Sequence, residues 1–119
     1  MEVVIVGNGI AGITAAWTIR NRCQKTTVTV ISREFESAYS ACVLPNYIAG
    51  EIERDKVFIK HREDYTRGNI RTVFGEEVTA IDVTRNKVYT TWQSFRYDRL
   101  ILALGSLPTI PIVEGISLK

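Results

Sequence analysis

The chain has 119 residues, 45% of them hydrophobic and 24% charged, with a formal net charge of +2. This length allows one compact domain, and so small and scattered a charge argues against nucleic acid or an anionic membrane as a partner. No stretch approaches the ~20 apolar residues that span a bilayer, and no basic region precedes the first apolar run as in a secretory signal. We therefore expect a cytoplasmic protein whose two cysteines, Cys23 and Cys42, are free thiols.

The first part of the chain predicts a βαβ unit. Val3–Val6 is a β-branched run, typical of a strand that is buried on both faces. A glycine-rich loop at residues 7–12 follows, and Ile13–Arg22 then favours a helix with basic residues at its C-terminal end. Thr27–Ile31 is a second strand. Strand, helix and strand within about 30 residues form a unit with parallel strands and a right-handed crossover.

The middle of the chain predicts short helices and a third strand. Pro45 favours the start of a short helix over Asn46–Ala49, which Gly50 would end. A second helix is expected around Lys60–Arg67. Asn69–Phe74 reads as the third strand of the parallel sheet.

After the third predicted strand the hydrophobic pattern changes to an alternation of period two. Val78–Val83 and Lys87–Trp92 alternate, with residues 84–86 as the turn between them, and Phe95–Leu104 is a third run. We expect these runs to form an antiparallel three-stranded β-meander. The predicted fold class is therefore α/β, with a Rossmann-like parallel βαβ sheet followed by this meander.

The loop after the first strand has the G-x-G-x-x-G spacing of a dinucleotide-binding turn, with the strand before it and the helix after it that this motif requires. The first glycine permits the tight turn, the second lets backbone approach a pyrophosphate, and the third lets the helix pack on the strand. The helix N-terminus would direct N–H groups at the phosphates. The alternative is a βαβ turn without a ligand. The loop residues expected to bind the dinucleotide are Gly7, Gly9, Ile10, Ala11 and Gly12.

The acidic residue that binds the adenosine ribose is expected about 20 residues further on, at the end of the second strand. Ser32 occupies the first position there and is not acidic, so Glu34 is our candidate for the ribose hydroxyls. The alternative is that Glu34 is a solvated loop carboxylate. Arg33 would suit a 2′-phosphate, and hence NADP, but it could equally stack beside the adenine or face solvent.

Three motifs, Val4–Gly12, Tyr39–Glu51 and Tyr97–Pro108, span nearly the whole chain in a familiar order. On these motifs the chain resembles the N-terminal FAD-binding domain of the pyridine nucleotide-disulfide oxidoreductases. It is most similar to the branch that holds NADH oxidases, coenzyme A-disulfide reductases, rubredoxin reductases and the flavoprotein part of NADH-dependent nitrite reductase. The resemblance implies FAD at the glycine loop, with NAD(P)H as the electron donor of the full-length enzyme.

The resemblance also implies further cofactor contacts. The segment Ala103, Leu104 and Gly105 is similar to the family's Ala-Thr-Gly segment against the flavin, with Leu104 in place of the threonine. Val78 matches a position whose backbone meets the adenine. Ser32 departs from the acidic residue of the oxidases and looks more like the rubredoxin and nitrite reductase branch.

Cys42 matches the single redox cysteine of the NADH oxidases and coenzyme A-disulfide reductases, and is our candidate catalytic residue. A helix starting near Pro45 would favour its thiolate, which attacks disulfides or is oxidised reversibly to a sulfenic acid. No second cysteine follows closely, which excludes an internal dithiol. Ala41 and Val43 replace the usual flanking asparagine and glycine, so the alternative is a buried, inert Cys42. We expect Cys23 to be an ordinary packed or surface thiol.

The resemblance implies that residues 1–107 form the N-terminal segment of an FAD-binding domain and that residues 108–119 lead toward an NAD-binding domain. Expected partners are the rest of the enzyme, further copies in a homo-oligomer, and a small-molecule or redox-protein acceptor. We expect no metal, because the one histidine, His61, lies in a charged stretch typical of a solvated face. Two alternatives stay open: a nucleotide-binding module without turnover, and a loop that takes NAD(H). The predicted meander disfavours the second.

Overall fold

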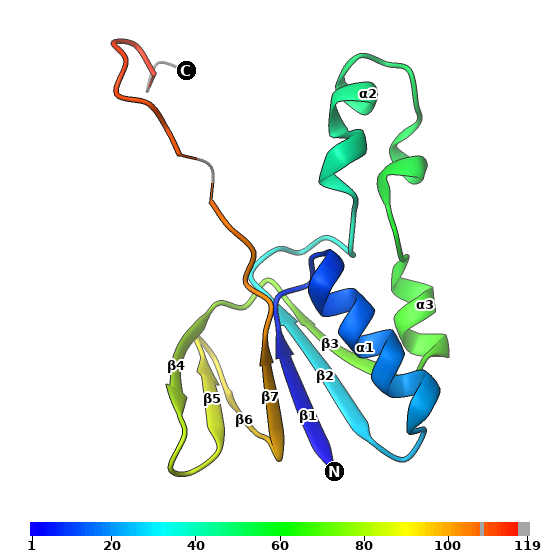
Figure 1. The fold of residues 1–119 in the computed structure, drawn as a ribbon, viewed down its shortest axis with the longest axis vertical. Helices are drawn as coiled ribbons and strands as arrows, with labels where there is room; N and C mark the ends of the chain where they lie inside the picture. Colours follow the sequence, from blue (N-terminus) through cyan, green and yellow to red (C-terminus); the bar gives the residue numbers. More distant parts are fainter. Residues whose placement is uncertain (108, 117–119) are drawn as a thin grey trace.

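The structure is a computed structural model that describes residues 1–107 and 109–116 (Figure 1). A four-stranded parallel sheet carries helices on one face and a three-stranded antiparallel sheet on the other. The strands are β1 (Glu2–Val6), β2 (Thr27–Ser32), β3 (Ile70–Phe74), β4 (Val78–Asp82), β5 (Lys87–Thr90), β6 (Ser94–Arg96) and β7 (Arg99–Leu102). The helices are α1 (Ile10–Arg22), α2 (Leu44–Ile48) and α3 (Arg62–Arg67), with 3₁₀ turns at Ala41–Val43 and Arg54–Val57.

The parallel sheet has the strand order β3-β2-β1-β7, and β1 lies at its centre between β2 and β7. The register places Val6 of β1 beside Ile31 and Leu102, so the carboxyl ends of three strands are level. The βαβ unit predicted from the sequence is confirmed. Helix α1 begins at Ile10, earlier than predicted, because Gly9 acts as its N-cap residue and the glycine loop itself enters the helix.

The two faces of the parallel sheet form two separate cores, as the alternation of side chains along a strand requires. Val3 and Ile5 face α1 and α3, where they pack with the buried Tyr65. Val4 and Val6 face the other way and pack with Val88 and Phe95 of the antiparallel sheet, together with Ile31 and Val73. The meander therefore covers the sheet face that no helix covers.

The prediction that Phe95–Leu104 is one strand of the meander is wrong in its extent. The meander is β4-β5-β6, and its third strand ends at Arg96. The Tyr97 N–H then donates to the carbonyl of Asn86, and the next N–H, of Asp98, donates to the carbonyl of Glu2. The chain thus leaves the meander between two residues and continues as β7, parallel to β1.

Between β2 and α3 the chain makes an excursion beyond the end of the sheet (Figure 1). It carries α2 and both 3₁₀ turns, and no residue of α2 is buried. Of the predicted connection 108–119, residues 109–116 extend away from the sheet as an exposed strand-free segment, while 108 and 117–119 lie outside the described residues. None of the helices within the described ranges is long and apolar enough to cross a membrane.

Candidate functional site

A cleft of about 700 Å³ opens at the carboxyl edge of the parallel sheet, and we call it the glycine-loop cleft. Its walls are the segments that follow β1, β2, β3 and β7, together with residues 39–42. In open α/β sheets this edge is where ligands bind. The cleft brings together the following residues singled out in the sequence: Gly7, Gly9, Ile10, Ser32, Arg33, Glu34, Cys42, Val78, Ala103, Leu104 and Gly105. Ala11 and Gly12 do not line it.

The cleft lies at the topological switch point of the sheet. From β1 the chain moves outward through β2 to β3, and it later returns to the other side of β1 as β7. The ends of β1 and β7 approach closely here, because the N–H of Ala103 donates to the carbonyl of Val6 at 2.8 Å. Gly7 has φ +109°, and a Cβ at this position would lie 2.0 Å from the Ala103 carbonyl oxygen. Only glycine fits between the two strand ends.

The other two glycines of the motif differ in what surrounds them. A Cβ on Gly12, which is buried in α1, would lie 2.0 Å from the carbonyl oxygen of Gly7. Gly12 is therefore required for the packing of helix against loop. A Cβ on Gly9 would meet no atom within 4 Å. The fold therefore does not require glycine at position 9. A ligand that approaches the backbone closely in the cleft would require it.

The N-terminus of α1 opens into this space, and its own first turn carries no negative charge. Gly9 provides no side-chain cap, and no acidic residue lies in the first turn of the helix. The first intrahelical bond runs from the N–H of Ile13 to the carbonyl of Gly9 at 2.9 Å. The preceding N–H groups have no acceptor within the helix, and the helix dipole adds a partial positive charge to them. This terminus suits an anionic group such as a phosphate.

The loop after β2 and the loop after β3 are joined by hydrogen bonds into one wall of the cleft. The N–H of Gly75 donates to the carbonyl of Glu34, and the N–H of Glu76 donates to the carbonyl of Ser32, both at 3.1 Å. The Ser32 hydroxyl in turn accepts the N–H of Glu34 at 3.2 Å. These bonds fix the backbone at the predicted ribose position while leaving the Glu34 carboxylate on the cleft.

Sequence reasoning missed two acidic residues of this wall. Glu76 and Glu77 line the cleft just before β4. The Glu76 carboxylate accepts hydrogen bonds from the Thr90 hydroxyl at 2.6 Å and from the Gln93 amide at 2.7 Å, and is thereby held against the meander. The sequence could have indicated that Glu76 and Glu77 lie at the cleft, because they follow the third strand closely and the carboxyl ends of parallel strands meet at one edge of the sheet.

The glycine loop is also held in place by the buried side chain of Tyr65, which the sequence analysis did not identify. The Tyr65 hydroxyl accepts the N–H of Ala38 at 3.2 Å and donates to Oδ1 of Asn8 at 2.8 Å. Burial raises the pKa of the Tyr65 phenol, so the donor proton is retained at neutral pH. One buried hydroxyl thus joins α3, the glycine loop and the segment that leads to Cys42.

Cys42 lies in the 3₁₀ turn at the cleft and is exposed, not buried as the inert alternative supposed. The segment before it is fixed by an isolated antiparallel bridge between Tyr39 and Phe58. Burial and the negative charge of Glu34 raise the pKa of the Tyr39 phenol. Tyr39 and Cys42 line the same cleft as the glycine loop.

A family model described as pyridine nucleotide-disulphide oxidoreductase matches residues 1–119. The chain belongs to this family. A curated relative, an NADH oxidase of Methanocaldococcus jannaschii, is 37% identical over 122 residues, which cover 97% of this chain and 27% of the relative. The chain thus spans about a quarter of the length of this relative.

Two solved structures that are 29% identical to the chain have the same fold. The NAD-dependent persulfide reductase from A. fulgidus matches with a TM-score of 0.93 and 29% identity, over 100% of this chain and 24% of that one. Putidaredoxin reductase, in its covalent complex with putidaredoxin, matches with a TM-score of 0.89 and 29% identity, over 94% of this chain and 27% of that one. The predicted α/β fold with its parallel sheet and meander is confirmed.

Proposed function

We propose that this chain is the FAD-binding portion of an NAD(P)H-dependent flavin oxidoreductase. The observation that carries the proposal is the open space at Gly9, in front of an uncapped helix N-terminus, at the switch point of the sheet. A dinucleotide pyrophosphate needs this combination of close backbone approach and free N–H groups. Membership of the family supports FAD over NAD(H) in this loop, since the family uses its first glycine loop for FAD.

The walls of the cleft fit the other parts of FAD. Ile10 is 67% exposed, Leu104 70% and Leu107 72%, and all three line the cleft. Large exposed apolar side chains in a cleft favour a ligand with flat apolar rings that would cover them. The volume of about 700 Å³ lies within the range of small-molecule sites.

Each wall has a proposed role. Glu34, with Ser32 behind it, would hold the ribose hydroxyls of the adenosine, and the backbone of Val78 would meet the adenine. The segment 103–105 would lie against the flavin. A bound flavin supplies the hydride and electron transfer, while this chain binds and orients it. The negative Glu34, Glu76 and Glu77 beside Arg33 disfavour a cofactor with a 2′-phosphate at this wall.

The test is an absorbance spectrum of the purified protein, followed by titration with FAD and, separately, with NADH. We expect the visible flavin band in the preparation or after addition of FAD. Gly9→Val should abolish it at a cost of no more than about 1 kcal/mol in stability, because a Cβ at this position meets no atom and valine is only a poorer N-cap residue. Ala49→Val adds bulk at an exposed position outside the cleft and should keep the band. A colourless protein that binds NADH but not FAD would contradict the proposal.

We further propose Cys42 as a redox thiol that works beside the flavin. Its exposure on the cleft supports a role in attack on an external disulfide or in reversible oxidation to a sulfenic acid by a peroxide, which is itself reduced to water or an alcohol. The competing possibility is a reductase that passes electrons to a protein partner without a thiol. Rates of thiol alkylation across pH, compared between Cys42→Ser and Cys23→Ser, separate the two. Alkylation of Cys42 no faster than that of a small free thiol would remove the case for a redox thiol.

For the whole enzyme we propose an NAD-binding domain beyond residue 107, a homo-oligomer, a cytoplasmic location, and a small-molecule or redox-protein acceptor. The greater length of the relatives supports the further domain, and the putidaredoxin complex of one neighbour supports a protein acceptor. Sedimentation and activity of the full-length protein with oxygen, disulfides and rubredoxin-type partners test these points. Without those parts, the chain would be a nucleotide-binding module that does not turn over.

A further inference from the structure

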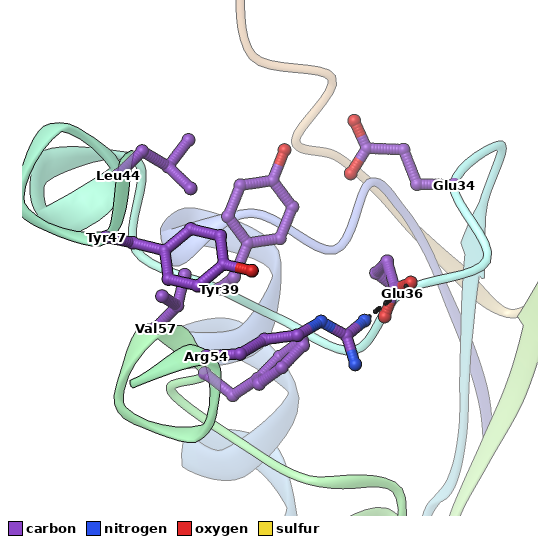
Figure 2. Close-up of a pocket in the computed structure, with 8 residues that line it drawn as sticks. Glu34, Glu36, Tyr39, Leu44, Tyr47, Arg54 and Val57 are labelled. Atoms are coloured by element: carbon purple, nitrogen blue, oxygen red, sulfur yellow. Dashed lines mark hydrogen bonds and ion pairs between the residues drawn. The ribbon is translucent and has the colours of Figure 1, made fainter. Parts of the chain in front are cut away.

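A second cavity, of about 290 Å³, lies beside the glycine-loop cleft, and we call it the aromatic pocket (Figure 2). Five of its lining side chains are aromatic or aliphatic: Tyr39, Leu44, Tyr47, Val57 and Phe58. Leu44 and Tyr47 are three residues apart on α2 and so lie on one face of the helix. The excursion described above is thus built around a concave apolar surface.

The walls of the pocket are held together by backbone hydrogen bonds. Tyr39 and Phe58 form the isolated bridge, and the N–H of Ser40 donates to the carbonyl of Val57 at 2.9 Å. On the other side of the bridge, the N–H of Ile59 donates to the carbonyl of Ala38 at 2.8 Å. These bonds fix the Tyr39 wall and the Phe58 wall of the pocket relative to each other.

The polar side chains of the pocket carry a net negative charge. Glu34 and Glu36 lie on the side opposite α2, where Arg54 reaches across the pocket to Glu36 at 3.2 Å (Figure 2). The Arg54 guanidinium also lies over the Phe58 ring, 5.3 Å from its centroid. One guanidinium balances one carboxylate, which leaves the charge of Glu34 without a counter-charge among the lining side chains.

We propose that the aromatic pocket binds a small organic cation, an ammonium group carried on one aromatic ring or a short alkyl chain. Aromatic faces and a carboxylate are the two groups that attract such a cation. Arg54 shows the chemistry within the pocket itself, since its cationic head lies against an aromatic ring and a carboxylate. A cavity of about 150 Å³ holds one benzene, so this pocket has room for one ring with a short tail.

The test uses three probes that share a phenylethyl group and differ in the charge of the terminal group: 2-phenylethylammonium, 2-phenylethanol and 3-phenylpropionate. Each is titrated into the isotope-labelled chain without any dinucleotide and followed by amide chemical shifts, so the result does not depend on the proposed function. We expect the ammonium probe to bind in the millimolar range, about threefold to tenfold more tightly than the neutral alcohol. The carboxylate should bind least, and the shifts should map to residues 34–58.

Two variants locate the source of the preference. Glu34→Gln keeps the shape of the side chain and should weaken the ammonium probe about twofold to fivefold without affecting the alcohol. Glu53→Gln removes an exposed carboxylate that does not line the pocket and should change neither. Tyr47→Ala should weaken both the ammonium and the alcohol, because it removes a wall. Equal affinities for the three probes, shifts outside 34–58, or an unchanged preference in Glu34→Gln would overturn the proposal.

Discussion

The substitutions Gly12→Ala and Gly9→Ala add the same methyl group three residues apart, and we expect only the first to lower the stability of the fold. At Gly12 the new Cβ would lie 2.0 Å from the carbonyl oxygen of Gly7, whereas at Gly9 it would meet nothing within 4 Å. Contacts of Cβ below 3.0 Å are essentially never seen, so α1 and the glycine loop must separate by about 1 Å to accept Gly12→Ala.

The magnitudes follow from this geometry. Overpacking of this kind costs roughly 1–3 kcal/mol or more, and the better helix propensity of alanine returns up to about 1 kcal/mol. We therefore expect Gly12→Ala to lower the free energy of unfolding by about 2 kcal/mol, or Tm by roughly 6–12 °C for a chain of this size. Gly9 has φ −76° and ψ −173°, which alanine adopts freely. Alanine is a poorer N-cap residue than glycine, which destabilises the fold, but it also lowers the entropy of the unfolded chain, which stabilises the fold. We expect the two effects to cancel to within about 0.5 kcal/mol.

The assay is thermal and urea unfolding of the two variants and the parent chain, followed by circular dichroism, together with FAD titration. Gly9→Ala should unfold with the parent and still bind FAD more weakly, since its methyl group occupies the space reserved for the pyrophosphate. Gly12→Ala should lose stability first and binding as a consequence. Equal stability of Gly12→Ala and the parent, or equal losses in both variants, would refute the division of roles between the two glycines.

Three further outcomes are expected. Tyr65→Phe removes the buried hydroxyl that joins two hydrogen bonds and should cost about 1–3 kcal/mol in urea unfolding, whereas Tyr89→Phe, at a half-buried strand position, should cost less. The backbone N–H of His61 donates to the Asp64 carboxylate at 2.9 Å and lowers the pKa of that carboxyl group. The ionised carboxylate therefore stabilises the fold at pH values above its ordinary pKa, and this stabilisation is lost as the pH falls through the lower pKa of the folded state. Asp64→Asn should make the stability less dependent on pH in this acid range. Asp98→Ala removes the carboxylate that accepts the N–H of Glu2 at 2.6 Å, and amide exchange should then rise at the start of β1 and β7.

The sequence was sufficient for the first half of the fold because local signals and long-range packing agree there. Local sequence signals here predict the same elements that the packed βαβ unit requires. These signals are the run Val3–Val6, the glycine spacing and the second strand. The extent of the last run, Phe95–Leu104, was mispredicted because its hydrophobic alternation continues through the point where the chain passes from the antiparallel sheet to the parallel sheet. The residues that divide it, Tyr97 and Asp98, do so through partners that are distant in the sequence, and no local pattern reports such partners.

The same distinction holds for the candidate site. The glycine loop and the segment 103–105 were identified by motif, and the structure places both on one cleft. The support from Tyr65 to Asn8 spans 57 positions, and the aromatic pocket combines α2 with the strand-like segments at Tyr39 and Phe58. Such features depend on how the excursion folds back on itself, which composition and periodicity do not encode.

The position of β7 beside β1 has a consequence for the order in which this chain can fold. Glu2 and Asp98 are 96 residues apart, yet they are joined by two hydrogen bonds at the start of the paired strands. During synthesis, one edge of the central strand β1 stays unpaired until residues 99–102 have emerged. The constriction around Gly7, which Ala103 completes, is then among the last parts of the domain to form. Pairings between such distant segments slow folding, so a chain cut before Arg99 would expose an unpaired apolar edge and would lack one wall of the cleft.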